Sequence, residues 1–254
     1  MQSDKPRQEV KKNGPIILIT LITFASLSDR LKAQDQGALY SQHEDLSGYI
    51  LHKHSLDQTL INGVGYYDKY PNVSGHPFLF EDSQPGSITL SGKVYEDLLI
   101  NYDLYSQHLV LEYMGRNKSY FKIILSPAHT GSFRMNDEWF QKLDLGDKRL
   151  LFYQVIGTDE LKLFVHHEKL LTGNTGDQQF LYRFSDPKMT YYLEYMGNIF
   201  PIKNKRSLAE VFSGSSKGEI RKYMKKNILS FQHMTPGELH RLIDFISSLN
   251  TSKP

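Results

Sequence analysis

The sequence predicts a mainly β protein (α+β overall), in which an antiparallel curved sheet forms a barrel or half-barrel with a C-terminal α-helical cap. Two observations predict the sheet. Across residues 48–202, short runs of Tyr, Phe, Val, Ile and Leu are separated by Gly, Asn, Asp and Ser, as in strands and turns. This region keeps no sustained 3.6-residue period, which argues against a doubly wound parallel fold. A change to helical spacing in residues 203–250 predicts the cap.

Residues 1–28 have the pattern of a secretory signal peptide. Four basic side chains precede an uncharged apolar run, residues 16–28. This run is shorter than the about 20 residues that cross a membrane, and a basic lead before such a run is typical of an export signal. Cleavage fits after Ser28 or after Ala33, and residues 29–47 then form a linker. The alternative for the apolar run is a buried helix or strand.

Export changes the charge balance of the chain. The 254 residues include 30 basic and 28 acidic side chains, and residues 1–28 hold four and two of them, which leaves 26 of each. A formally neutral mature protein has little long-range attraction for phosphates, so nucleic acid is not an expected partner. The chain has no cysteine, which excludes disulfides, thiolate metal sites and a cysteine nucleophile. No membrane span is expected in the mature protein.

Antiparallel hairpins are expected where two apolar runs flank a short turn. The Ser91-Gly92 pair predicts one turn, and residues 157–159 predict another. The expected hairpins cover residues 87–95, 109–125 and 148–167, and further strands cover residues 181–184 and 191–195.

The C-terminal segment has the signals of helix starts and of apolar helix faces. Capping boxes, in which Ser or Thr is followed three residues later by Glu, predict helix N-termini. They are Ser207 with Glu210, Ser216 with Glu219, and Thr235 with Glu238. Apolar side chains then recur at helical spacing and are expected to pack on the sheet, closing an edge or a mouth. These stripes are Ile220, Tyr223, Met224 and Ile228, then Leu239, Leu242, Ile243, Ile246 and Leu249.

Residues 203–226 carry eight basic and two acidic side chains. This local excess predicts either a patch for an anionic lipid or glycan, or simply the solvated face of a helix. Residues 214–218 also match the G-x-S-x-G pattern of hydrolases. That motif needs a strand before its serine, whereas the preceding residues here predict a helix, so a catalytic serine is not expected.

Aromatic and histidine side chains supply the remaining candidate sites. Tyrosine offers an apolar ring with one polar atom, so a tyrosine-lined sheet can bind a ligand. The alternative is that cross-strand aromatic pairs stabilise the sheet. The ligand-binding candidates are Tyr66, Tyr67, Tyr102, Tyr191 and Tyr192. His52 and His54 flank one residue, so a strand would place both on one face as two metal ligands; surface histidines are the alternative. No cofactor is predicted.

Several segments together resemble a group of uncharacterised exported proteins of Bacteroidota. They are residues 61–63, 73–78, 86–95 and 102–104, and in the tail residues 191–193, 205–208 and 220–227 with Phe231. The resemblance implies a home in the periplasm or at the cell surface of a Gram-negative bacterium. It implies no catalytic residue.

These observations favour a non-enzymatic envelope protein that binds a hydrophobic or glycan-like ligand in the curve of the sheet. Such a carrier needs a cavity of at least about 300 Å³. The alternative is an interaction or scaffold protein that contacts another envelope protein, with a filled core and an exposed apolar patch. A hydrolase is the third hypothesis, and it needs a cleft with converging titratable groups. The sequence does not predict the oligomeric state.

Overall fold

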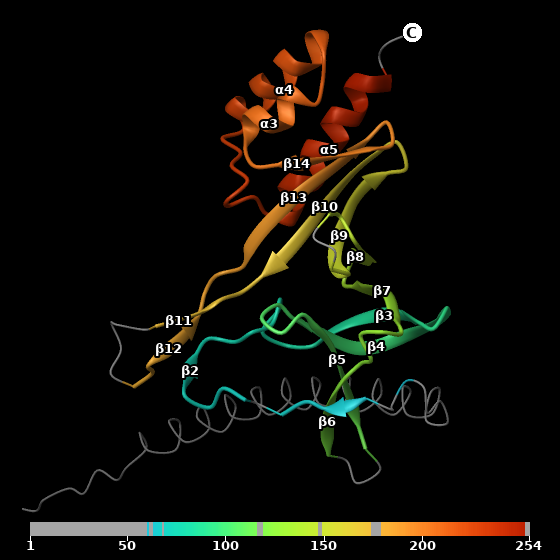
Figure 1. The fold of residues 1–254 in the computed structure, drawn as a ribbon, viewed down its shortest axis with the longest axis vertical. Coiled ribbons are helices and arrows are strands. Elements are labelled where there is room, and N and C mark those ends of the chain that lie inside the picture. The colour runs from blue at the N-terminus through green and yellow to red at the C-terminus, as the bar shows by residue number, and fades with distance from the viewer. Residues whose placement is uncertain are drawn as a thin grey trace, which may run out of the picture. The chain divides into compact units, whose positions relative to one another are not determined.

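Eleven of the strands form one antiparallel sheet (Figure 1). The computed structural model describes residues 60, 63–67, 69–115, 119–146, 149–173 and 179–251, all within the unit Tyr49–Pro254. The predicted signal peptide, the linker and both residues of the His52/His54 pair lie outside this described part. The strands of the large sheet are β1 (Val64–Gly65), β3 (Gln84–Leu90), β4 (Lys93–Asp103), β5 (His108–Met114), β6 (Tyr120–Ile124), β7 (Thr130–Met135), β8 (Glu138–Leu143), β9 (Leu151–Thr158), β10 (Leu161–Glu168), β13 (Lys188–Tyr195) and β14 (Asn198–Ile202).

The strand order of the large sheet is β1-β6-β5-β4-β3-β7-β8-β9-β10-β13-β14. β1 and β14 stand at its two ends and do not pair with each other, so the sheet is open. The predicted antiparallel sheet is therefore confirmed, whereas a closed barrel is not. A second sheet has the order β11-β12-β2, in which β2 runs parallel to β12. Its strands are β2 (Val73–Ser74), β11 (Leu171–Gly173) and β12 (Tyr182–Phe184).

Local turn chemistry explains the hairpins. Ser91 and Gly92 join β3 to β4 with φ angles of 51° and 80°, the left-handed conformation of a two-residue hairpin turn, as predicted. The β9–β10 hairpin also forms, but its turn lies at Asp159 and Glu160 rather than at residues 157–159. Gly157 instead lies within β9, where a Cβ atom would stand 3.0 Å from the Ile243 side chain.

Three further elements, α3 (Lys205–Glu210), α4 (Gly214–Lys226) and α5 (Pro236–Thr251), follow β14. The capping box predicted for α5 is confirmed: the Thr235 N–H donates to Glu238 Oε2 over 2.8 Å. The other two boxes are wrong. Asn204 caps α3, and Ser207 supplies the reciprocal bond of that box. Ser216 lies buried inside α4, whose N-cap residue is Ser213.

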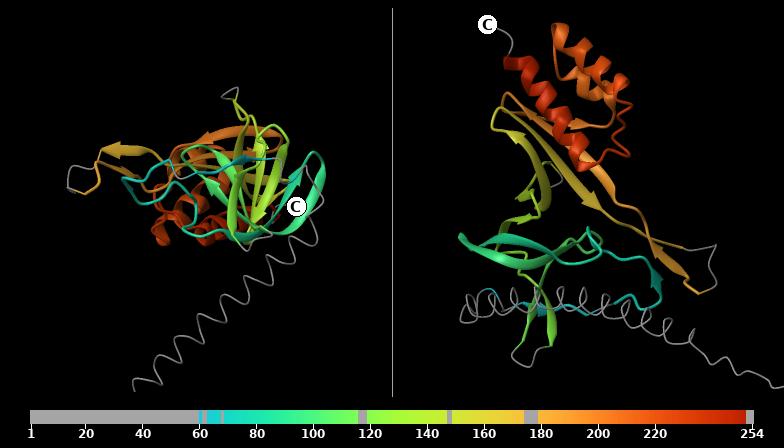
Figure 2. Two further views of the ribbon diagram at one scale, coloured as in Figure 1. Left: turned by 90° about the horizontal axis from the view of Figure 1, so that it is seen from below. Right: turned by 180° about the vertical axis from the view of Figure 1, so that it is seen from behind.

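The three helices pack on the part of the sheet that contains β9, β10, β13 and β14, as Figure 2 shows from two further directions. The predicted apolar stripes supply most of the buried helix side chains. They meet strand residues such as Leu163 and Leu193 in one core. Ile228 does not join this core: it is 87% exposed, because α4 ends two residues before it. Among the described residues, no helix is long and apolar enough to span a membrane.

Aromatic side chains fill a second core between β4, β7, β8 and β9. Phe133 stacks on Phe140 with ring centroids 4.5 Å apart, and Tyr102 lies against Phe133 at 5.4 Å and against Phe152 at 5.8 Å. All four side chains are buried. This part of the sheet is therefore filled by its own side chains.

Candidate functional site

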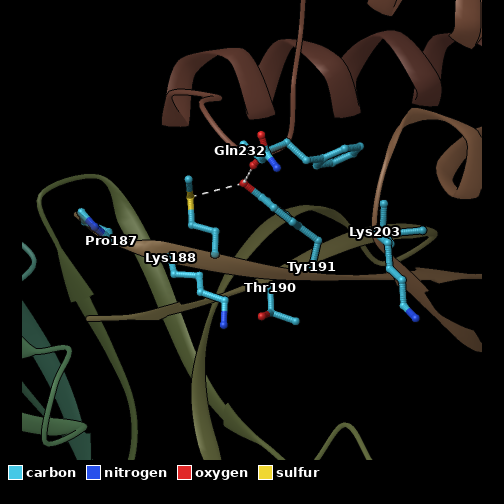
Figure 3. Close-up of a pocket in the computed structure, with 9 residues that line it drawn as sticks. Pro187, Lys188, Thr190, Tyr191, Lys203 and Gln232 are labelled. Carbon is cyan, nitrogen blue, oxygen red and sulfur yellow. Dashed lines mark hydrogen bonds between the residues drawn. The ribbon is translucent and has the colours of Figure 1, made fainter. Parts of the chain in front are cut away.

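A groove of about 530 Å³ lies between β13, the end of β14 and the chain segment that precedes α5 (Figure 3). Met189, Tyr191, Ile202 and Phe231 supply its apolar wall. Tyr191 points from β13 towards Gln232, whereas Lys188 extends to the other side of the strand (Figure 3). This arrangement follows from the alternation of side chains along a strand, which turns Tyr191 towards the helices.

The Tyr191 side chain is held in place by the residues of the groove. Its hydroxyl donates a hydrogen bond of 2.7 Å to the Phe231 carbonyl oxygen, and the two ring centroids lie 4.8 Å apart. Desolvation raises the pKa of Tyr191 to about 12. The phenol is therefore neutral at physiological pH, and the Tyr191 side chain forms part of the wall of the groove.

A second hollow of about 410 Å³ adjoins this groove, because both are lined by Lys203, Phe231 and Gln232. Lys205 and Arg206 lie at its other end. We call the two hollows together the β13 groove. Its character changes along its length, from the apolar wall at Tyr191 to cations at the start of α3.

The cations at this end are exposed. Arg206 Nε forms an ion pair of 2.8 Å with Glu210 Oε1 within α3. Within the described part of the chain, no ion pair involves Lys203 or Lys205. The basic excess of residues 203–226 in the sequence already indicated this cationic end of the groove. The apolar end of the groove could not be predicted from a local pattern, because Phe231 and Tyr191 lie far apart in the sequence.

A separate hollow of about 520 Å³, the aromatic pocket, lies by β6 and the loop that contains β2. Two polar side chains, His76 and Lys122, share its lining. The aromatic side chains of the pocket come from three separate segments of the chain. They are Tyr66, Tyr70, Phe78, Tyr120 and Phe184.

Buried polar groups form hydrogen bonds with residues that line the aromatic pocket. Asp103, only 1% exposed, accepts a hydrogen bond of 3.3 Å from the Tyr66 hydroxyl. Lys169 Nζ donates to the carbonyl oxygens of His76 and Phe78, each over 2.9 Å. Burial lowers the pKa of Lys169. The pKa of His76 is also lowered, by burial first and by the nearby Lys169 charge second.

The five candidate tyrosines do not converge on one site. Tyr66 lines the aromatic pocket and Tyr191 lines the β13 groove. Tyr102 is fully buried, with its hydroxyl donating to Gln107 Oε1 over 2.5 Å, so it belongs to the core and not to a binding surface. Tyr67 is 75% exposed and does not line the aromatic pocket, and Tyr192 packs edge-on against Tyr153.

The histidines of the described part do not form a metal centre. No group of three His, Asp or Glu side chains could hold a metal ion among the residues that the structure describes.

A chain of hydrogen bonds, which the sequence did not predict, leads from helix α5 into the sheet. His167 Nε2 lies 2.7 Å from Gln154 Oε1, and Gln154 Nε2 donates to Glu138 Oε2 over 2.6 Å. His240 Nε2 lies 3.3 Å from the same carboxylate oxygen.

The G-x-S-x-G motif does not form a nucleophile elbow, because Ser216 is buried within α4. No family model, no curated protein and no solved structure matches this chain.

Proposed function

We propose that this protein is an exported, non-enzymatic binding protein of a Gram-negative cell envelope, and that the β13 groove holds an amphiphile with an anionic end. One observation carries the proposal. The apolar wall at Tyr191 and Phe231 continues directly into the cationic end at Lys203 and Lys205. An acyl chain with a carboxylate or phosphate head has the same two-part character.

The size and lining of the groove suit such a ligand. Ligand sites commonly measure about 300–1,000 Å³ and are mostly apolar, with a few polar groups that orient the ligand. The apolar end, at about 530 Å³, falls in this range. Removal of apolar surface from water contributes about 25 cal/mol per Å², so the alkyl part would supply most of the binding free energy.

The cationic end would supply orientation and some selectivity for charge. Lys203 and Lys205 are exposed, so their attraction for an anion is weakened by salt. The affinity for an anionic amphiphile should therefore fall as the ionic strength rises. A neutral analogue of the same chain length should bind more weakly and without this salt dependence.

We place the ligand in this groove, and not against the β4 and β7–β9 strands, because the aromatic core fills that part of the sheet.

The same filled core favours a second candidate function, an interaction protein that contacts another envelope protein. The two functions differ in what the purified protein carries: a carrier retains a small molecule, whereas an interaction protein retains a polypeptide.

Native mass spectrometry of the protein, purified from its own envelope without detergent, tests the proposal first. We expect a reproducible extra mass of lipid size that disappears on denaturation. Titration of the full chain with a fluorescent fatty acid, dansyl-undecanoic acid, then locates the site. The double substitution Lys203→Glu and Lys205→Glu should weaken binding at least tenfold.

A matched control makes the same change of charge elsewhere. Lys222→Glu with Lys225→Glu alters two exposed cations of α4 that do not line the groove, and should leave the affinity within about twofold, or about 0.4 kcal/mol, of the parent. Gln232→Trp should block the groove without changing its charge. Equal affinities for both double variants, or a bare protein mass with no binding of the probe, would overturn the proposal.

A further inference from the structure

The aromatic pocket has walls that are held in place before any ligand arrives. The ring centroids of Tyr66 and Phe78 lie 5.4 Å apart, and those of Tyr70 and Phe184 lie 5.1 Å apart in an edge-on arrangement. Such pairs stabilise one another beyond simple burial. Tyr120, at the start of β6, is 45% exposed and forms the outer rim. The pocket therefore presents a preorganised aromatic surface to solvent.

Polar groups in the lining can exchange hydrogen bonds with a ligand. His76 is half-buried in this lining, and its buried Nδ1 makes no hydrogen bond of ordinary geometry within the described part of the chain. Besides the tyrosine hydroxyls, the ring of His76 and the ammonium of Lys122 are the polar groups that the lining offers to a ligand. The lowered pKa of His76 keeps its ring neutral near pH 7, and a neutral imidazole has one donor and one acceptor nitrogen.

The charges around the aromatic pocket are compensated, unlike those of Lys203 and Lys205 in the β13 groove. Lys122 Nζ lies 3.2 Å from Glu112 Oε2. Beneath the pocket, Lys169 donates to two carbonyl oxygens, with the carboxylate of Asp103 on the same polar floor. An anionic ligand would meet little net positive charge here.

A wholly apolar ligand fits the pocket poorly for the opposite reason. It would bury His76 and Lys122 without giving them hydrogen bonds, which is unfavourable. The pocket requires a neutral ligand with an apolar face for the rings and polar groups around its edge. A pyranose ring has this character, because its C–H groups form a flat apolar face and its hydroxyl groups project from the rim.

From these observations we propose that the aromatic pocket is a second binding site, and that it takes a neutral sugar ring of a glycan. Tyr66 and Tyr120 would contact the apolar face of the sugar. His76 and Lys122 would bind its hydroxyl groups. This proposal does not depend on the one for the β13 groove, since the aromatic pocket and the β13 groove share no lining residue.

Saturation-transfer NMR and calorimetry of the full chain with two neutral probes, cellotetraose and chitotetraose, test the proposal. We expect at least one of them to bind, with an affinity that does not change between low and high NaCl. Tyr120→Ala and His76→Ala should each weaken binding at least tenfold. Thermal melting checks that each variant is folded.

Tyr67→Ala is the matched control, because Tyr67 is an exposed tyrosine in the same part of the chain that does not line the pocket. This variant should bind the sugar within about twofold of the parent. The Lys203→Glu and Lys205→Glu double variant should also keep sugar binding, which separates a failure of this site from a failure of the groove.

Three outcomes would overturn the proposal. The first is that neither probe binds at about 10 mM, a concentration at which even a Kd of about 1 mM gives a strong signal. The second is that Tyr120→Ala and Tyr67→Ala bind equally well. The third is that binding falls steeply with salt, which would indicate a charged ligand.

Discussion

The hydroxyl of Tyr191 donates a hydrogen bond of 2.7 Å to the carbonyl oxygen of Phe231, and thereby ties β13 to the segment before α5. Tyr191→Phe removes this bond and leaves a buried carbonyl oxygen without it, so we expect a loss of about 1–2 kcal/mol of stability. Urea denaturation at pH 7 measures the change. An unchanged urea midpoint would show that the bond does not stabilise the fold.

The same phenol should make the protein sensitive to alkali. Desolvation raises the pKa of Tyr191 to about 12, above its ordinary value of 10, so the unfolded chain loses this proton first. The contribution to stability is therefore present below pH 10 and is lost as the pH rises from 10 towards 12. Tyr191→Phe should decline less steeply over this window than the parent. A parallel decline in both proteins would contradict the assignment.

His167 should make the protein sensitive to mild acid. Burial first, and the neighbouring His166 second, lower the pKa of His167 to about 4 from an ordinary 6.5. The unfolded chain therefore binds a proton below pH 6.5 while the folded protein does not. Stability should fall as the pH drops from 6.5 towards 4, by up to about 3 kcal/mol from this group.

His167→Gln removes the titrating ring and retains a donor that can reach Gln154. The urea midpoint of the His167→Gln variant should change less than that of the parent between pH 7 and pH 5. The pKa of His76 is also lowered, so the variant should keep some pH dependence of its stability. A variant with the full pH dependence of the parent would show that His167 does not carry it.

Ile228 follows the C-cap residue of helix α4 and adopts a conformation that normally requires glycine. Its φ angle is 55°, and the bonds from Leu229 N to Met224 O and from Ile228 N to Lys225 O form a Schellman motif. A β-branched residue is strained in this left-handed region. Ile228→Gly should therefore stabilise the protein by about 1 kcal/mol.

The same substitution of isoleucine by glycine in a strand should have the opposite effect on stability. Ile199 lies in β14 and is also exposed, so Ile199→Gly should destabilise by about 0.5–1 kcal/mol through the entropy of glycine in an extended strand. Urea midpoints of the two variants test the pair. Destabilisation by both would mean that the exposed Ile228 side chain stabilises the fold through contacts that outweigh its strain.

The N-termini of α4 and α5 provide a comparison of two caps. Thr235 exchanges hydrogen bonds with Glu238, including a donation from Glu238 N to Thr235 Oγ1 over 3.3 Å. Ser213, the N-cap residue of α4, makes no such side-chain bond. Thr235→Ala should cost about 1 kcal/mol, whereas Ser213→Ala should leave the melting temperature almost unchanged. Equal effects would contradict the cap assignment.

Local sequence patterns predicted some residues of the candidate sites but not others. The basic end of the β13 groove is visible in the sequence as the charge excess of residues 203–226. The tyrosine pattern also included two residues that line hollows, Tyr66 and Tyr191. It could not separate them from Tyr102, because burial depends on which strands become neighbours, and Tyr102 faces Phe133 and Phe152 from other strands.

The sequence alone determined the elements whose causes lie within a few residues. The Ser91-Gly92 turn, the capping box at Thr235 and the apolar stripe of α5 each depend on backbone conformation or on spacing along the chain. The tertiary structure decided whether the sheet closes and which side chains meet in the β13 groove and in the aromatic pocket. Those outcomes depend on contacts between distant segments, such as Tyr191 with Phe231, and no local pattern determines them.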